Sequence, residues 1–330
     1  TNVTQSRIGP GTGGFTEPRK ERVVMPLTGT YGATDHVLGH ELVHSFQFDI
    51  ALNQDMGLNL QKVPLWLVEG MAEYLTLGRY DPHTAMWMRD AVLRDEVPTI
   101  KEMANPRDYF PYRYGQALLA YVGGKYGDQA VTDLYKIAGR VGVDSASAFL
   151  YGISADSLSK EWASAMHTAY TPLLENRTHP DSAGTRVLAQ DIDGGRLNVG
   201  PMLSPDGRYV AFLSERNLFD ITLFVADAET GEVLESLGSV STTLDLDAVR
   251  FISSAGTWNP SGEKLAFVSF ANGDNEISIW NVESGDVERS FKVKGVTAIK
   301  NPAWSPDGTK IAFSGMEGGI SDLYVLDMES

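Results

Sequence analysis

Ser204-Pro-Asp-Gly-Arg-Tyr-Val-Ala-Phe212 decides the fold of the second half of this 330-residue chain, because the stretch recurs. It returns as Asn259-Pro-Ser-Gly-Glu-Lys-Leu-Ala-Phe267 and as Ser305-Pro-Asp-Gly-Thr-Lys-Ile-Ala-Phe313. Each copy joins a Pro-Gly turn to an apolar run that favours a β-strand. A second expected strand follows each copy, at residues 221–226, 277–282 and 322–327. A repeat of about 50 residues predicts successive sheets of about four strands each.

These repeats resemble the blades of TolB-type β-propellers, whose signature joins Ser-Pro-Asp-Gly to a following apolar strand. The resemblance covers residues 187–330 and implies an all-β propeller region that offers a surface to a protein partner. Because closed propellers typically have four to eight blades, about three blades predict a partial ring. We therefore expect either a chain that is truncated at its C-terminus or a ring that is completed elsewhere.

The composition limits the class of protein. Hydrophobic residues make up 42% and charged residues 21% of the chain, which is typical of a soluble globular protein. The formal net charge of −16 argues against nucleic acid as a partner. No apolar run approaches the ~18 residues of a transmembrane helix, so we expect no transmembrane segment. The absence of cysteine excludes disulfides, thiolate catalysis and Cys-ligated metals.

The pattern of apolar residues changes near residue 180. Before this point they recur at helical spacing, as in residues 117–122 and 158–174. After residue 187 short alternating runs are separated by turns, and residues 178–184 have the composition of a linker. We therefore expect one domain at 1–180 and a second at 181–330.

The motif that carries chemistry lies in the first domain, at His40-Glu-Leu-Val-His44. On a helix, residues i and i+4 project from the same face, so His40 and His44 can bind one metal ion. Glu41 lies beside them, where it can take a proton from a metal-bound water. Five apolar residues of the same helix predict that it buries an apolar face, with the histidines in a packed wall: Val37, Leu38, Leu42, Val43 and Phe46.

A second acidic motif follows at Trp66-Leu-Val-Glu69-Gly-Met-Ala-Glu73. Zinc hydrolases need a third protein ligand and an open fourth position. Glu69 offers a carboxylate for that purpose. Glu73, one turn further along the same face, can accept the free ring N–H of a ligating histidine.

Two other ligand sets do not fit. A metzincin would need Gly at position 47 and His at position 50, but the sequence has Gln47 and Ile50. Asp49 lies five residues after His44 and would point elsewhere on a helix. Neither of these two sets is therefore favoured over one that includes the carboxylate of Glu69.

The two motifs together resemble the gluzincin metallopeptidases, the clan of thermolysin and aminopeptidase N, over about residues 34–126. The resemblance implies a thermolysin-like α+β domain, mostly helical, in which Zn²⁺ is held by His40, His44 and Glu69. It implies peptide-bond hydrolysis with Glu41 as general base and Glu73 supporting a ligating histidine. The Gly-x-Met-Glu-Asn segment of the aminopeptidase branch is absent, which favours an endopeptidase.

Three further features lie near this motif. Related sequences place a Tyr-x-Gln at the start of the next long helix, which favours Tyr114 as the donor to the transition state; alternatively, the tyrosines of residues 109–114 pack the wall. Residues 22–27 have the pattern of an edge strand. Such a strand either pairs with an extended substrate or is an ordinary part of a sheet. His36 precedes His40 by four residues on the same helix, where it either extends the polar face or, as the favoured alternative, lies at the surface.

Three functions are compatible with the sequence. The first is an active zinc peptidase whose propeller restricts access or holds the peptide or protein substrate. The second is a propeller-based binding or scaffold protein with an inactive peptidase-like domain, and the third is a zinc hydrolase of non-peptide amides or esters. The intact motif favours the first. The domain combination resembles exported bacterial proteins, which implies an extracytoplasmic location, periplasmic or secreted.

Overall fold

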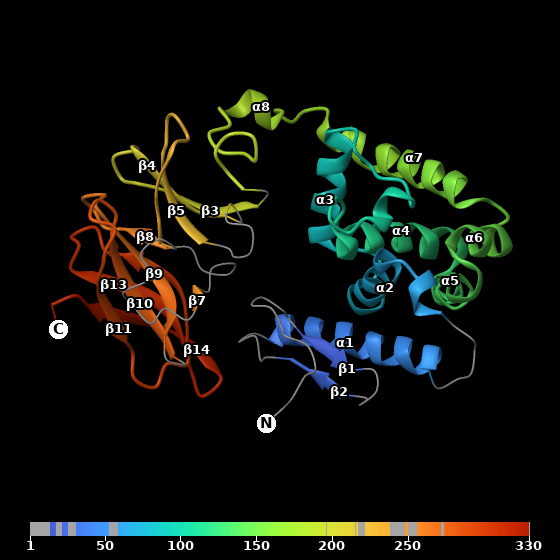
Figure 1. Cartoon of the computed structure of the whole chain (residues 1–330), viewed down its shortest axis with the longest axis horizontal. Helices are drawn as coiled ribbons and strands as arrows, with labels where there is room; N and C mark the ends of the chain where they lie inside the picture. The colour runs from blue at the N-terminus through green and yellow to red at the C-terminus, as the bar shows by residue number, and fades with distance from the viewer. Residues whose placement is uncertain are drawn as a thin grey trace. The chain divides into compact units, whose positions relative to one another are not determined.

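The computed structural model divides the chain into two compact units, Thr1–Thr178 and His179–Ser330. The first unit is mostly helical and the second is built mainly from β-strands (Figure 1). A helical region followed by a β-sheet region is therefore confirmed. None of the described helices combines the length and the apolar character needed to cross a bilayer. The described residues are 14–17, 22–25, 31–52, 59–195, 197–214, 216, 222–237, 248–249, 256–271 and 274–329.

The first unit begins with a β-hairpin and continues with helices. The strands β1 (Phe15–Glu17) and β2 (Arg22–Val24) are antiparallel, and β2 covers the described part of the expected edge strand at 22–27. Residues 26–27 of that prediction lie outside the described residues. The helices are α1 (Tyr31–Leu52), η1 (Leu60–Lys62), α2 (Leu65–Leu77), α3 (Pro82–Leu93), η2 (Glu102–Ala104), α4 (Pro111–Tyr126), α5 (Asp128–Val141), α6 (Val143–Tyr151) and α7 (Ala155–Leu174).

Helix α2 lies between α1 and α4, and its buried side chains form part of the core of this unit (Figure 1). Trp66 of α2 and Trp162 of α7 are fully enclosed, as expected for core residues. Trp87 is half-buried and packs against the same core. The core also includes Leu67, Met71, Leu118, Leu119, Val122 and Leu134.

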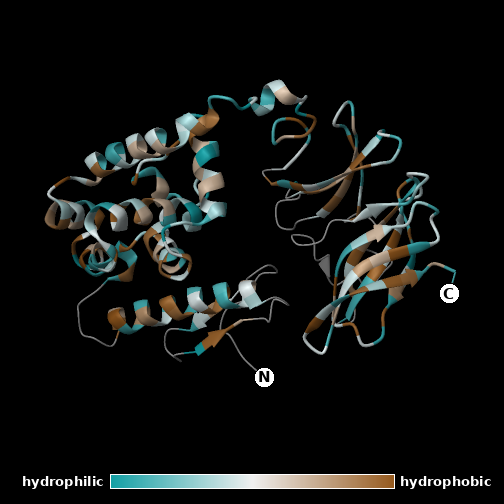
Figure 2. Cartoon of the chain, turned by 180° about the vertical axis from the view of Figure 1, so that it is seen from behind, coloured by the Kyte–Doolittle hydropathy of each residue, from teal (hydrophilic) through white to brown (hydrophobic). Residues whose placement is uncertain are grey.

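Helix α1 buries a polar face instead of an apolar one. Leu38, Leu42 and Phe46 are 42%, 44% and 68% exposed, so the prediction that they are buried is wrong. The reason is geometric: each residue turns the helix by about 100°, so a residue two positions along points to the opposite side. Figure 2 shows hydrophobic and hydrophilic residues interspersed along this helix. Its buried side chains are His40, Glu41, His44 and Gln47, whereas Val43 packs partly against the core.

Two glycines allow α2 and α4 to approach closely. A Cβ atom added to Gly70 would lie 2.4 Å from the carbonyl carbon of Gly115. A Cβ added to Gly115 would lie 2.1 Å from the carbonyl oxygen of Trp66. Because both obstacles are backbone atoms, neither can move aside without shifting a helix. Gly70 therefore fixes the position of α2, which carries both Glu69 and Glu73.

The second unit contains a short helix, α8 (Pro180–Ala183), and three antiparallel sheets. In the first and third sheets neighbouring strands follow one another in sequence order, as in propeller blades, whereas β7 and β8 of the second sheet both pair with β9. The first sheet has β3 (Asn198–Leu203), β4 (Tyr209–Ser214), β5 (Thr222–Asp227) and β6 (Val233–Ser236). The second has β7 (Ala248–Val249), β8 (Thr257–Trp258), β9 (Lys264–Ala271), β10 (Asp274–Asn281) and β11 (Val287–Lys292), and the third has β12 (Ala298–Trp304), β13 (Lys310–Glu317) and β14 (Ile320–Asp327).

The sequence repeat forms the same turn in all three sheets. The central glycines Gly207, Gly262 and Gly308 have φ angles of 76°, 76° and 77°, a left-handed conformation that favours glycine. In each turn the glycine N–H donates to the carbonyl three residues earlier, at 2.9, 3.0 and 2.9 Å. The three copies are therefore structurally equivalent.

The sheets pack face to face through two apolar clusters. One cluster joins the first and second sheets and includes Leu213, Phe267 and the fully buried Trp280. The other joins the second and third sheets through residues such as Val268 and Ile311. Strands β9 and β10 of the second sheet thus serve two interfaces, since alternate side chains point to opposite faces.

We expect Gly70→Ala to lower the free energy of unfolding of the helical unit by about 1–3 kcal/mol, because the added methyl group overpacks the α2–α4 contact. Gly124→Ala is the matched control, since an added Cβ there meets nothing within 4 Å and lies on the exposed face of α4. It should raise the stability by about 0.5–1 kcal/mol. Urea unfolding followed by circular dichroism at 222 nm measures both. Equal effects of the two substitutions would contradict the close approach.

Candidate metal centre

Three predicted ligand residues meet where α1 packs against α2. Nε2 of His40 lies 3.1 Å from Nε2 of His44. Oε2 of Glu69 lies 3.1 Å from the first nitrogen and 3.2 Å from the second. The structure thus brings His40, His44 and Glu69 together as the sequence predicted, with one candidate ligand atom from each residue.

The spacing of these atoms suits a tetrahedral zinc ion. Ligands bound about 2.0–2.1 Å from one ion at tetrahedral angles lie about 3.3–3.4 Å apart. The three measured separations are within a few tenths of an ångström of that value. Two imidazoles and one carboxylate are also the donor set of catalytic zinc sites that keep a fourth position open. The residues therefore fit Zn²⁺.

Both histidines are oriented through their other ring nitrogen. His40 Nδ1 lies 2.8 Å from Oε1 of Glu73, and His44 Nδ1 lies 2.8 Å from Oε1 of Gln47. Gln47 in turn donates from its amide nitrogen to the carbonyl of Val68 at 3.0 Å. With Nδ1 as the donor in each ring, both Nε2 atoms present lone pairs to a common point.

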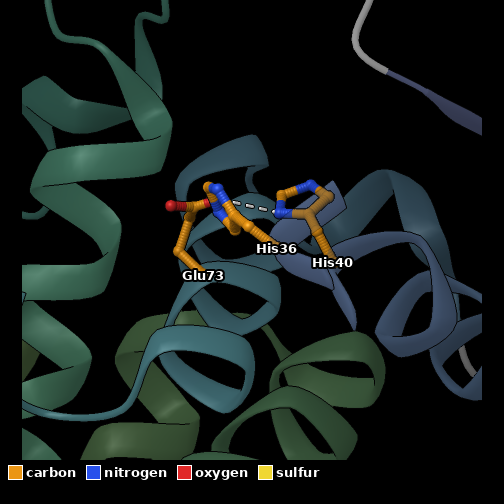
Figure 3. Close-up of side chains that lie close together, drawn as sticks. All are labelled: His36, His40 and Glu73. Atoms are coloured by element: carbon orange, nitrogen blue, oxygen red, sulfur yellow. Dashed lines mark hydrogen bonds and ion pairs between the residues drawn. The ribbon is translucent and has the colours of Figure 1, made fainter. Parts of the chain in front are cut away.

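A second cluster shares His40 and lies beside the first. Figure 3 shows His36 and His40 of α1 converging on the carboxylate of Glu73, with His36 Nε2 2.9 Å from Oε1. Arg113 Nη1 donates to the other oxygen of Glu73 at 2.9 Å. Because a guanidinium already neutralises this carboxylate, the cluster is better suited to orienting His40 than to holding a cation. The prediction that His36 is a surface residue is corrected: it is half-buried and hydrogen-bonded to Glu73.

Burial and pairing shift the pKa values of these groups in opposite directions. Burial alone would lower the pKa of His40, but hydrogen bonds with Glu69 and Glu73 outweigh it and raise this pKa to about 9. Burial alone would raise the pKa of Glu69, yet hydrogen bonds from His40 and His44 lower it to about 2. Hydrogen bonds with His36 and His40 likewise outweigh burial and lower the pKa of Glu73 to about 2. The carboxylates are therefore ionised at neutral pH.

Glu41 lies next to the histidines and is held by the hairpin. Glu41 is only 5% exposed. The hydroxyl of Thr16 on β1 lies 2.8 Å from Oε2 of Glu41 and 2.9 Å from its carbonyl oxygen. The predicted base is thus enclosed between α1 and β1, beside the metal ligands.

Tyr112, and not Tyr114, lies against the histidine pair. The ring of Tyr112 stacks on His40 with centroids 5.6 Å apart. Burial, followed by the charges of Glu69 and Glu41, raises its pKa, so the phenol stays protonated. Among the described ring contacts, Tyr114 packs edge-on against Trp87 and Tyr109, which corresponds to the alternative of wall packing. Two positions on a helix differ by about 200°, which explains why the two tyrosines diverge.

Comparison with known proteins yields matches to the second unit. Residues 238–330 match the family model described as "TolB beta propeller domain". The chain therefore carries a TolB-like β-propeller region, and the match includes the second and third sheets. No curated protein matches the chain.

Solved structures that match include two TolB proteins and one protease propeller. TolB from Acinetobacter baumannii is 25% identical, with 41% of this chain and 31% of that chain covered and a TM-score of 0.33. A putative TolB from Agrobacterium tumefaciens is 18% identical, with 41% and 44% covered and a TM-score of 0.33. The β-propeller domain of the Trilobed protease from Pyrococcus furiosus is 22% identical, with 39% and 40% covered and a TM-score of 0.28. The chain spans less than half the length of each structure.

We expect zinc binding at pH 7 to release protons. His40 is protonated at this pH because its pKa is raised to about 9, and a metal ion binds only the free base. Affinity should therefore rise about tenfold per pH unit for each proton released, and the contribution of His40 should level off above about pH 9. Calorimetry in two buffers of different ionisation enthalpy counts these protons. A zinc affinity that does not change between pH 6.5 and 8.5 would refute the assigned protonation.

Glu73→Ala should weaken zinc binding by about 10–100-fold, because His40 loses the carboxylate that fixes its ring. Glu175→Ala, at an exposed glutamate that follows α7, is the control and should leave the affinity unchanged. Competition against a fluorescent chelator gives both dissociation constants. Unchanged affinity in Glu73→Ala would show that His40 needs no such support.

Proposed function

We propose that this chain is a zinc-dependent peptide-bond hydrolase, with endopeptidase action favoured. The observation that carries the proposal is the convergence of His40, His44 and Glu69, whose ligand atoms lie 3.1–3.2 Å apart beside the buried Glu41. His40, His44 and Glu69 would hold the zinc ion, which would supply Lewis acidity and a lowered pKa of water at this position. The same arrangement resembles that of gluzincin metallopeptidases.

Glu41 is the general base in this proposal. It takes a proton from the attacking water and delivers it to the leaving amine, so its protonation state is restored at the end of the reaction. Burial and the contact with Thr16 keep its carboxylate in one place between α1 and β1. The base is therefore oriented before substrate arrives.

Tyr112 replaces Tyr114 as the proposed donor to the developing oxyanion. Its phenol stays protonated because burial and nearby carboxylates raise its pKa. A protonated phenol donates a hydrogen bond to a negatively charged oxygen, and such a donor typically contributes about 10²–10³-fold to the rate. The stacking on His40 keeps this ring next to the ligand set.

The propeller region is proposed to restrict access to the site or to hold the peptide or protein substrate. An extracytoplasmic location, periplasmic or secreted, is part of the same proposal and is supported by the similarity to TolB propellers. The second candidate is a propeller-based binding or scaffold protein with an inactive peptidase-like domain. The retained partners of both histidines, Glu73 and Gln47, favour the active enzyme, since an inactive relic has no need of them.

Glu41→Gln should keep about one zinc per chain and lose at least about 100-fold in kcat/KM, because the amide has nearly the same shape but cannot act as a base. Glu69→Ala should lose both zinc and activity. Internally quenched peptides with blocked N-termini measure endopeptidase cleavage, and mass spectrometry of the native protein measures zinc. Full activity in Glu41→Gln would overturn the mechanism. Zinc-loaded wild-type protein that cleaves no peptide in a broad library would favour the scaffold function.

A further inference from the structure

Gly14 and the strand β1 that follows it lie against the carboxylate of Glu41, an arrangement that the metal ligands do not explain. The hydroxyl of Thr16 lies 2.8 Å from Oε2. At Gly14, a Cβ atom would lie 2.9 Å from Oε1 and 3.0 Å from Cγ of the same side chain. Both oxygens of Glu41 are thus close to the segment of residues 14–16, and Thr16 lies 25 residues before Glu41 in the sequence.

The two contacts have different effects on the two oxygens. The Thr16 hydroxyl donates to Glu41, with Oε2 at 2.8 Å and the backbone carbonyl oxygen at 2.9 Å, so Oε2 is the carboxylate oxygen that Thr16 engages. The Cβ position of Gly14 lies nearest Oε1, and it is the absence of a side chain at Gly14 that leaves room for this oxygen. Oε1 is therefore the oxygen that keeps both space and a lone pair for a proton from elsewhere.

We propose that β1 and the glycine that precedes it position the catalytic base: Thr16 fixes the rotation of the Glu41 carboxylate through Oε2, and Gly14 leaves Oε1 room to accept the proton. The proposal rests on the proposed peptidase function and assigns two positioning residues to it. Displacement of a reacting group by about 1 Å can cost about 100-fold in rate. Loss of the Thr16 hydroxyl should therefore lower kcat and leave KM unchanged.

Thr16→Val removes the hydroxyl while it keeps the shape and the strand preference of the residue. We expect kcat to fall about 10–100-fold, with KM, zinc affinity and melting temperature unchanged. Thr16→Ser retains the hydroxyl and should stay within about threefold of the wild type. This rescue separates positioning from a merely structural role of the strand.

Gly14→Ala should lower kcat in the same way, because the new methyl group displaces the end of the flexible Glu41 side chain. Gly32→Ala on α1 is the matched control, since a Cβ there meets nothing within 4 Å. Equal kcat values for Gly14→Ala, Gly32→Ala and the wild type would overturn the role of Gly14. Equal kcat values for Thr16→Val and the wild type, or for Thr16→Val and Thr16→Ser, would overturn that of Thr16.

Binding of a dipeptide hydroxamate provides a readout that does not require turnover. A hydroxamate binds the zinc-loaded protein and shares its acidic proton with the adjacent carboxylate, so its affinity depends on the orientation of Glu41. Thr16→Val should weaken this binding about tenfold, and Thr16→Ser should restore it, which calorimetry measures. If the wild type cleaves no peptide yet shows this pattern, the proposed function fails and the positioning of Glu41 stands. If all three proteins bind the hydroxamate equally, the positioning proposal is overturned whether or not peptides are cleaved.

Discussion

The packing of α1 against α2 depends on how several buried polar side chains neutralise one another. His40, His44 and Glu73 are at most 9% exposed, and an ionised group that is buried without a partner costs several kcal/mol. The two carboxylates of α2 face the imidazoles of α1, so each charge has a partner within 3.2 Å. This pairing explains why α1 turns its polar side inward and exposes Leu42 and Phe46. The interface is therefore built around the site, and the site is not an addition to an apolar interface.

The close contact of α2 with α4 extends this constraint. Gly70, between the two glutamates of α2, removes the side chain that would keep α4 at a distance. Arg113 then reaches Glu73, and Tyr112 reaches His40, from the first turn of α4. The glycine in the Glu-Gly-x-Ala-Glu motif thus has a packing reason that complements the chemistry of its neighbours. A wider separation of the helices would leave the carboxylate of Glu73 without its guanidinium.

Local patterns in the sequence predicted the three propeller-like sheets and the meeting of His40, His44 and Glu69. The sheets follow from Pro-Gly turns that precede strands, and the pairing of the two histidines follows from i to i+4 positions on a helix. Glu69 is expected at this position from the resemblance to gluzincin metallopeptidases. The pattern did not reveal that His36 binds Glu73, since a histidine one turn before the motif has no local signal of a partner 37 residues away. Gln47 had such a signal, because it follows His44 by three residues on the same helix face. The positions of Tyr112 and Thr16 beside the site depend on how α4 and β1 pack against α1. Spacing along the chain does not predict that packing.

Different interactions specify the structures of the two units: apolar packing in the second unit and a polar network in the first. In the second unit apolar side chains such as Phe267 on one face and Val268 on the other fill both faces of a sheet, and one turn repeated three times sets the register. In the first unit a polar network sets how α1 lies on α2, and each member has a partner with defined geometry. A polar network of this kind tolerates little change, since loss of one member leaves another buried and unpaired. The first unit is therefore the part of the chain in which single side chains have the largest effect on both stability and chemistry.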